Sequence, residues 1–144
     1  MTAMLRRALE SEGFDVADFC NLFAEWKTNW PQDEYAFWFF GKDGLYAFPK
    51  RQGESVLHHV HLPPENRAED LARWNLQLER LSRKVSDTAL VYTFDPRYGY
   101  LLLYVAREPN GHALSDMSTQ ETHELMNGLA DQAEAFRHDG SVYL

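Results

Sequence analysis

The chain has 144 residues, of which 44% are hydrophobic and 25% charged, and we treat residues 1–144 as a single domain of soluble globular composition. Its formal net charge of −8 argues against a general nucleic-acid-binding protein, which needs clustered Lys and Arg, but leaves room for a local basic site. A single cysteine excludes an intrachain disulfide, and neither a signal peptide nor a membrane-spanning run is present, so we expect a cytoplasmic protein.

The N-terminal third predicts two helices and then a hairpin. The helices are expected over residues 2–12, where Gly13 ends the first, and over 15–27, where apolar residues recur at helical spacing. The aromatic stretch YAFWFF at 35–40 favours a strand. The glycines of the turn at 41–44 then predict a return strand over 45–48.

The remaining elements indicate an antiparallel sheet. We expect strands over 56–62, 89–94 and 100–107, with a hairpin turn at 95–99. A helix over 65–84 with Leu71, Trp74, Leu78 and Leu81 on one face lies between the first two of these strands. Ser118 followed by Glu121 predicts the start of a last helix, a loop with Pro109–Gly111 precedes it, and Gly140 lies past its end. Short turns between sequential strands indicate an α+β domain with helices against one face of the sheet.

Three histidines within four residues stand out in the stretch SVLHHVHLPP at 55–64. Side chains alternate across a strand, so His58 shares a face with the apolar residues at 56, 60 and 62, whereas His59 and His61 share the other face. The first face is the better core face. We therefore expect His58 to be buried or at an edge, and His59 and His61 to point together onto an open face.

Two imidazoles on one open face could bind a metal, transfer protons, or simply be solvated. A metal needs at least one more ligand, and His112 and His123 are distant in sequence, while no Cys or carboxylate has a recognisable ligand spacing. We therefore predict no metal. Acid–base work suits histidine better, because its pKa lies near neutrality.

Five segments, taken in order and spacing, resemble the YafO family of type II toxins. They are FGKDGLY at 40–46, VLHHVHL at 56–62, LSRKVSDTALVY at 81–92, YLLLYVAREP at 100–109 and AEAFR at 133–137. The resemblance covers about residues 19–137, which we treat as a toxin-like core. Within the histidine stretch, it is His59 and His61 that match the family pattern.

The resemblance implies a bacterial toxin of a toxin–antitoxin pair. Members of the family are ribosome-dependent mRNA interferases that are neutralised by a cognate antitoxin. The implied partners are therefore an antitoxin, the ribosome and mRNA, with no membrane and no small-molecule cofactor. The implied fold is RelE/ParE-like: a short antiparallel sheet flanked by N-terminal and C-terminal helices, with one helix inserted between strands.

Metal-free RNA cleavage uses the 2′-OH as nucleophile and needs a base, an acid and cations or N–H donors on the phosphate. We expect His59 and His61 to supply the base and the acid. Arg83, which matches the family motif, suits a phosphate clamp, and Arg107 and Arg137 are further cationic candidates. Tyr46 and Tyr92 could stack on a base.

Structural roles compete with several of these assignments. Arg83 could be a solvated helix end, Arg137 could favour the negative end of the last helix, and Tyr92 could pack in the core. A second class of function also stays open: a non-catalytic binding protein of the same fold that inhibits a translation or replication partner without cleaving RNA. The histidine pair and Arg83 favour the enzyme, whereas the acidic balance favours the binder.

Overall fold

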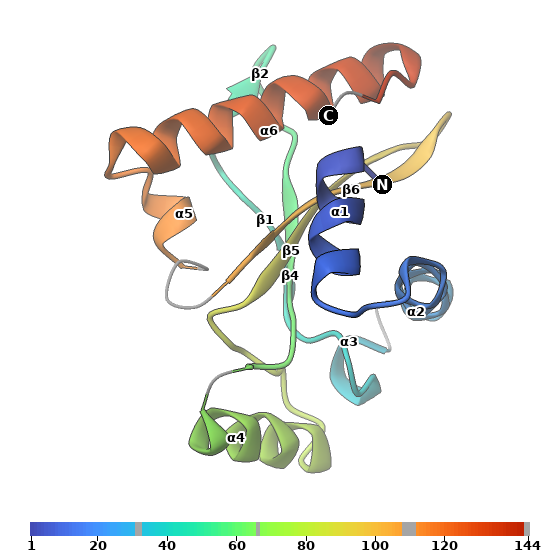
Figure 1. The fold of residues 1–144 in the computed structure, drawn as a ribbon, viewed down its shortest axis with the longest axis vertical. Helices are drawn as coiled ribbons and strands as arrows, with labels where there is room; N and C mark the ends of the chain where they lie inside the picture. The colour runs from blue at the N-terminus through green and yellow to red at the C-terminus, as the bar shows by residue number, and fades with distance from the viewer. Residues whose placement is uncertain (31–32, 66, 108–111, 143–144) are drawn as a thin grey trace.

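A four-stranded antiparallel sheet with the strand order β1-β4-β5-β6 forms the centre of the computed structural model, which describes residues 1–30, 33–65, 67–107 and 112–142 (Figure 1). Its strands are β1 (Asp43–Leu45), β4 (His58–His61), β5 (Ala89–Asp95) and β6 (Gly99–Ala106), and a small separate hairpin pairs β2 (Lys50–Arg51) with β3 (Glu54–Ser55). The helices are α1 (Ala3–Ser11), α2 (Val16–Thr28), α3 (Asp33–Ala36), α4 (Ala68–Glu79), α5 (Ala113–Asp116) and α6 (Gln120–Asp139). The expected α+β class, with an antiparallel sheet and helices at both ends of the chain, is confirmed.

The helix ends follow local capping chemistry. The side chains of Thr2 and Asp15 accept hydrogen bonds from backbone N–H groups in the first turns of α1 and α2. The capping box of α6 is formed by Thr119 and Thr122, one residue later than the predicted pair. Gly140 ends α6 with a φ of 79°, a left-handed conformation that glycine adopts without strain. The expected loop signal at 109–111 lies outside the described residues.

Helices cover both faces of the sheet, so the expectation of helices on one face is wrong. The face that carries Val60, Leu90 and Tyr92 packs against α1 and α2, and we call it the α1–α2 face. The face that carries Val91 and Leu101 packs against α6, and we call it the α6 face. The reason lies in β5, whose successive side chains are apolar and buried on both faces instead of alternating with polar ones.

The aromatic stretch at 35–40 is not a strand, and the predicted hairpin over 35–48 is wrong. Residues 33–36 form the short helix α3, and Phe37 and Phe40 turn into the core, where the Phe40 ring stacks on Trp26 with centroids 4.9 Å apart. Strand pairing begins only at Gly41, whose N–H donates to the carbonyl of His61. Here the burial of aromatic side chains, rather than their preference for strands, decides the local structure.

Helix α4 is shorter than the expected 65–84 and is anchored by one buried side chain. Trp74 is that side chain, and its indole N–H donates to the carbonyl of Trp38 at 3.1 Å. Leu71 and Leu81 are 42% and 62% exposed, so the expected apolar face of this helix is wrong at both positions. Figure 1 shows α4 beyond one end of the sheet, apart from the other helices. Across the described ranges, no helix is long and apolar enough to cross a membrane.

Candidate functional site

A cavity of about 260 Å³ opens on the α6 face of the sheet, where β1 and β4 extend beyond the cover of α6. Its polar lining comes from β4, from the segment after β1, from the start of the β5 region and from α5: Tyr46, His59, His61, Ser86, His112 and Ser115. We call it the histidine cavity. Strand alternation brings His59 and His61 to the same face, as predicted, while His58 stacks on Tyr92 on the α1–α2 face with centroids 5.1 Å apart.

The imidazole of His59 is held between Tyr46 and Gly44. The Tyr46 ring stacks on it with centroids 4.0 Å apart and planes inclined by 20°. Gly44 is its direct partner in the β1–β4 register, and a Cβ there would lie 3.3 Å from the Cε1 atom of His59. Burial lowers the pKa of His59 to about 4, and repulsion from His61 and Lys42 adds to this effect. Within the described residues, its buried Nδ1 atom has no hydrogen-bond partner.

His61 can hold a hydrogen bond in either protonation state. Its Nδ1 atom lies 3.0 Å from the backbone nitrogen of Ser86 and 2.7 Å from the backbone oxygen of the same residue. An unprotonated Nδ1 accepts from the Ser86 N–H, and a protonated Nδ1 donates to the Ser86 carbonyl. Burial lowers the pKa of His61, whereas the Ser86 backbone acts in the opposite direction. In both states Nε2 remains for other partners.

The three histidine rings of the cavity form a row. The ring centroids of His59 and His61 are 6.1 Å apart, and those of His61 and His112 are 5.7 Å apart. The Nδ1 atom of His112 lies 2.9 Å from a carboxylate oxygen of Asp87. Repulsion from His112 and Lys42 lowers the pKa of both His59 and His61, so an anion bound among these groups would oppose that shift. The carboxylate of Asp87 acts in the opposite direction and raises the pKa of His61.

The expectation of an open face for His59 and His61 is wrong. His61 is only 6% exposed and His59 is half-buried, because Tyr46 stacks on His59 while Ser86 and His112 lie against His61. The accessible parts of both side chains line the histidine cavity. This enclosure makes the two rings better placed for proton transfer than solvated histidines, since water competes less for their nitrogen atoms.

Sequence reasoning missed Lys42 and gave His112 no role in proton transfer. The N–H of His61 donates to the carbonyl of Lys42, which extends the β1–β4 pairing and places Lys42 opposite His61, on the histidine side. Strand alternation could have placed Lys42 on this side, since it precedes Gly44, the register partner of His59, by two residues. The interpretation of 41–44 as a turn prevented this prediction. His112 comes from a distant loop, and no local pattern indicates its approach.

Arg83 and Tyr92 lie apart from the histidine cavity. The guanidinium of Arg83 donates to one carboxylate oxygen of Glu34 at 2.9 and 2.5 Å and to the carbonyl of Asp43 at 3.2 Å. Tyr92 is 1% exposed on the α1–α2 face, where its hydroxyl donates to Asp43 at 2.7 Å, and burial raises its pKa. The expected stacking of Tyr92 on a base is therefore replaced by core packing, because its ring has no exposed face. Tyr46 is also buried, against His59.

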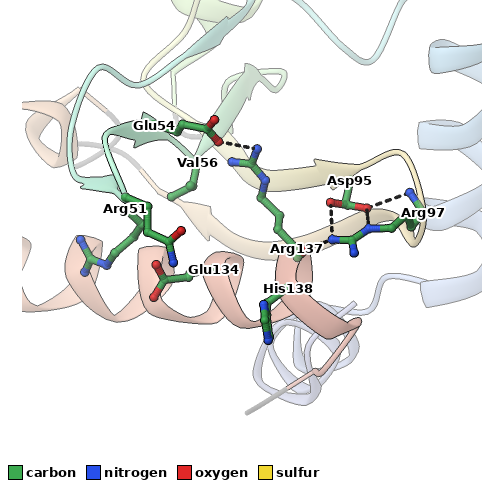
Figure 2. A pocket seen from close by; sticks show the side chains of 9 residues that line it. Arg51, Glu54, Val56, Asp95, Arg97, Glu134, Arg137 and His138 are labelled. Carbon is green, nitrogen blue, oxygen red and sulfur yellow. Dashed lines mark hydrogen bonds and ion pairs between the residues drawn. The ribbon is translucent and has the colours of Figure 1, made fainter.

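Arg137 lines a different cavity, of about 300 Å³, between the β2–β3 hairpin, the β5–β6 turn and the end of α6 (Figure 2). Arg137 is paired with Glu54 and Arg97 with Asp95, each at 3.2 Å, and Figure 2 shows both contacts. Arg51 at the same cavity donates to Asp131 at 2.9 Å and to the backbone of Asn127. These arginines connect the two hairpins to α6, and their charges are met by carboxylates.

Arg107 is likewise bound to protein carboxylates, since its two terminal nitrogens contact Glu12 and Glu65. Of the seven residues proposed from the sequence, the histidine cavity thus brings together His59, His61 and Tyr46. It does not bring in Arg83, Tyr92, Arg107 or Arg137.

The sequence over residues 25–138 matches the family described as toxin YafO, type II toxin–antitoxin system. The chain belongs to the YafO toxin family. No curated protein matches the chain. No solved structure matches it either. The YafO match includes the residues of the histidine cavity, from Leu45 to Ser115, and the family implies a cognate antitoxin.

Among the residues of this YafO family member that the structure describes, no three His, Cys, Asp or Glu side chains gather in an arrangement that could hold a metal ion. His59, His61 and His112 line one cavity in a row without converging on one point in that way.

Proposed function

We propose that this toxin is a metal-independent endoribonuclease that cleaves mRNA on the ribosome, with a RelE/ParE-like fold and with His59 and His61 as its acid–base pair. The observation that carries the proposal is the placement of two imidazoles in one cavity with centroids 6.1 Å apart. A phosphodiester between two such rings can have its 2′-OH near one and its 5′-oxygen near the other.

His59 is assigned as the base, because burial keeps it neutral at pH 7. It removes the proton of the 2′-OH, whose oxygen then attacks the phosphorus. His61 is assigned as the acid, because its protonated form can donate to the Ser86 carbonyl through Nδ1 and to the leaving 5′-oxygen through Nε2. The bond from phosphorus to the 5′-oxygen breaks, which leaves a 2′,3′-cyclic phosphate and a 5′-hydroxyl.

Lys42 and His112 are assigned to the charge that develops on the phosphate. Both add positive potential at the two catalytic rings, which lowers the pKa of each ring in the free protein. A bound phosphate anion raises those pKa values again, so His61 gains its proton when substrate is present. This coupling lets a buried pair with lowered pKa values work near pH 7.

Recruitment by the ribosome compensates for the weak attraction of an acidic chain to RNA. A chain at −8 gains little from general attraction to RNA phosphates, so contacts with the ribosome must supply much of the affinity. The same charge favours the second candidate, a binder that blocks a translation partner without cleavage. The two candidates predict different RNA products.

The experiment combines purified protein with ribosomes that are translating a defined mRNA, followed by analysis of the RNA ends. We expect new 3′ ends that carry a 2′,3′-cyclic phosphate, and no such ends with His61→Gln. In a second arm, protein dialysed against a chelator and then freed of it should cleave equally well and melt at the same temperature. Translation arrest without new ends would support the binder, and a stoichiometric metal whose removal stops cleavage would contradict metal independence.

A further inference from the structure

A groove beside α4 continues from the histidine cavity. It has a volume of about 410 Å³, and its polar lining includes Arg67, Asp70, Arg73, Ser86, Asp87 and His112. We call it the α4 groove. Ser86 and His112 line the groove and the histidine cavity alike, so the two spaces meet at these residues. A chain-like ligand whose reacting group lies in the histidine cavity can therefore continue along α4.

The two arginines of the groove are available to an outside anion. Their side chains are 67% and 64% exposed, and both pair with the same carboxylate, Asp70, at 3.9 Å from Arg67 and 3.3 Å from Arg73. Arg67 has a further exposed partner, Glu69, at 3.5 Å. Exposed pairs within one helix are weak, so another anion can replace them readily. This distinguishes the groove from the cavity of Figure 2, whose arginines connect separate elements.

The other acidic residue of the groove, Asp87, is already paired with His112. It accepts hydrogen bonds from the backbone N–H of His112 at 2.6 Å and lies 2.9 Å from the Nδ1 atom of the same residue. Residues 67–84 carry five of the 14 basic residues and only three acidic ones, in a chain whose net charge is −8. Of these, Lys84 is fully buried and Arg83 is paired with Glu34, and the groove itself is lined by two arginines and two carboxylates, so its attraction for an anion depends on the exposure of Arg67 and Arg73.

Helix α4, at which both arginines lie, is anchored to the rest of the fold by buried contacts. Its buried Trp74 donates to the Trp38 carbonyl, and Gly41 packs so closely that a Cβ there would lie 2.3 Å from the Lys84 carbonyl oxygen. Lys84 is fully buried, and its ammonium donates to the carbonyls of Glu34 and Tyr35 at 3.4 and 3.3 Å. Arg67 and Arg73 take no part in this anchoring, so their replacement should leave the fold intact.

We propose that the α4 groove binds the sugar–phosphate backbone of the RNA strand next to the scissile phosphate, with Arg67 and Arg73 on its phosphate oxygens. The proposal rests on the proposed function, since it takes the histidine cavity as the place of cleavage. The planar guanidinium forks can each engage two phosphate oxygens, which fixes the strand as well as attracting it. Contacts of this kind position RNA without reading its sequence.

The test is the binding of a single-stranded, 2′-O-methylated RNA, which lacks the nucleophile, measured by fluorescence anisotropy over a range of salt concentrations. The variant is Arg67→Ala/Arg73→Ala. The matched control is Arg6→Ala/Arg7→Ala, which removes the same charge from the exposed side of α1, on the other face of the sheet. Melting temperatures of all three proteins verify folding.

We expect the groove variant to bind at least tenfold more weakly than wild type, and the control to bind within about twofold of it. The slope of log K against log salt should fall by about 1.4 in the groove variant, at about 0.7 per lost phosphate contact on a single strand. Equal binding by both variants, or wild-type protein that does not bind this RNA even at low salt, would overturn the proposal. Groove-dependent binding without cleavage on ribosomes would support the groove and refute the proposed nuclease.

Discussion

The ring of Tyr46 lies flat against the imidazole of His59, with centroids 4.0 Å apart, and both side chains line the cavity in which we place the chemistry. Tyr46 is 6% exposed, and burial raises its pKa to about 12, so the phenol stays neutral in the working range. Tyr46 therefore acts through packing: its buried ring fixes the plane of the His59 ring.

Replacing Tyr46 should separate packing from hydroxyl chemistry. Tyr46→Ala opens a void beside His59, and we expect a loss of about 3–5 kcal/mol in the free energy of unfolding, together with a loss of cleavage. Tyr46→Phe keeps the aromatic ring, so it should retain most of the stability and most of the cleavage activity. Urea unfolding and cleavage on ribosomes check this. A Tyr46→Phe variant that is stable but inactive would show that the hydroxyl takes part in the reaction.

Gly44→Ala should press on the other side of the His59 ring. Its Cβ would lie 3.3 Å from the Cε1 atom of His59, so the ring must shift by a few tenths of an ångström. We expect cleavage to fall at least tenfold with little change in melting temperature, because a small misplacement of a proton-transfer group is costly. Gly128→Ala on α6 is the control, since its Cβ would meet nothing within 4 Å. Equal activity of the two variants would argue against His59 as a catalytic group.

The stability of the protein should fall when the pH is lowered from about 7 to 4.5. Burial lowers the pKa of His59 from 6.5 to about 4, so the unfolded chain binds protons in this window before the folded one does. The contribution of a neutral His59 is therefore complete above about pH 6.5 and is lost as the pH falls through 4. His58 and His61 also have lowered pKa values and act in the same direction.

Unfolding by urea at pH 7 and pH 4.5 measures this loss. With His59→Gln the difference in stability between the two pH values should be smaller than in wild type, since one of the three groups is gone. An unchanged difference would show that His59 is not buried as the structure has it. NMR titration of the histidine Cε1 protons provides the direct pKa.

Substitution of Arg83 tests whether this residue clamps a phosphate, as predicted from the sequence, or stabilises the fold through its contact with Glu34. Its partner Glu34 is 6% exposed, so Arg83→Ala leaves a buried carboxylate without its cation, and we expect a cost of about 1–3 kcal/mol. The double variant Arg83→Ala/Glu34→Gln should recover most of this stability. Both are compared with wild type by thermal unfolding and cleavage. Loss of cleavage at unchanged stability would instead restore Arg83 as the phosphate clamp predicted from the sequence.

Local signals in the sequence were sufficient for much of the fold. Thr2, Asp15 and Gly140 mark helix ends that the structure has within about one residue, and the alternation at 58–61 separates His58 from His59 and His61 correctly. Each of these features depends on residues close together in the chain. The same is true of the β5–β6 hairpin and its turn.

Features that depend on distant partners could not be predicted in this way. The aromatic residues at 37 and 40 have strand propensity, yet the core formed with Trp26 takes them out of any strand. Arg83 matches a family motif, but its contact with Glu34 depends on helix α3, 49 residues away in the sequence. His112 approaches His61 from 51 positions further along the chain, so its place in the cavity follows only from the tertiary fold.

The central claim is that His59 and His61 cleave RNA, and the most direct measurement is the mapping of mRNA ends by primer extension after induction in growing bacteria. His59→Gln and His61→Gln are compared with His58→Gln, which makes the same change on the opposite face of β4. We expect growth arrest and new mRNA ends with wild type and His58→Gln, and neither with His59→Gln or His61→Gln at comparable melting temperatures. New ends that persist in the His59→Gln/His61→Gln double variant would contradict this claim.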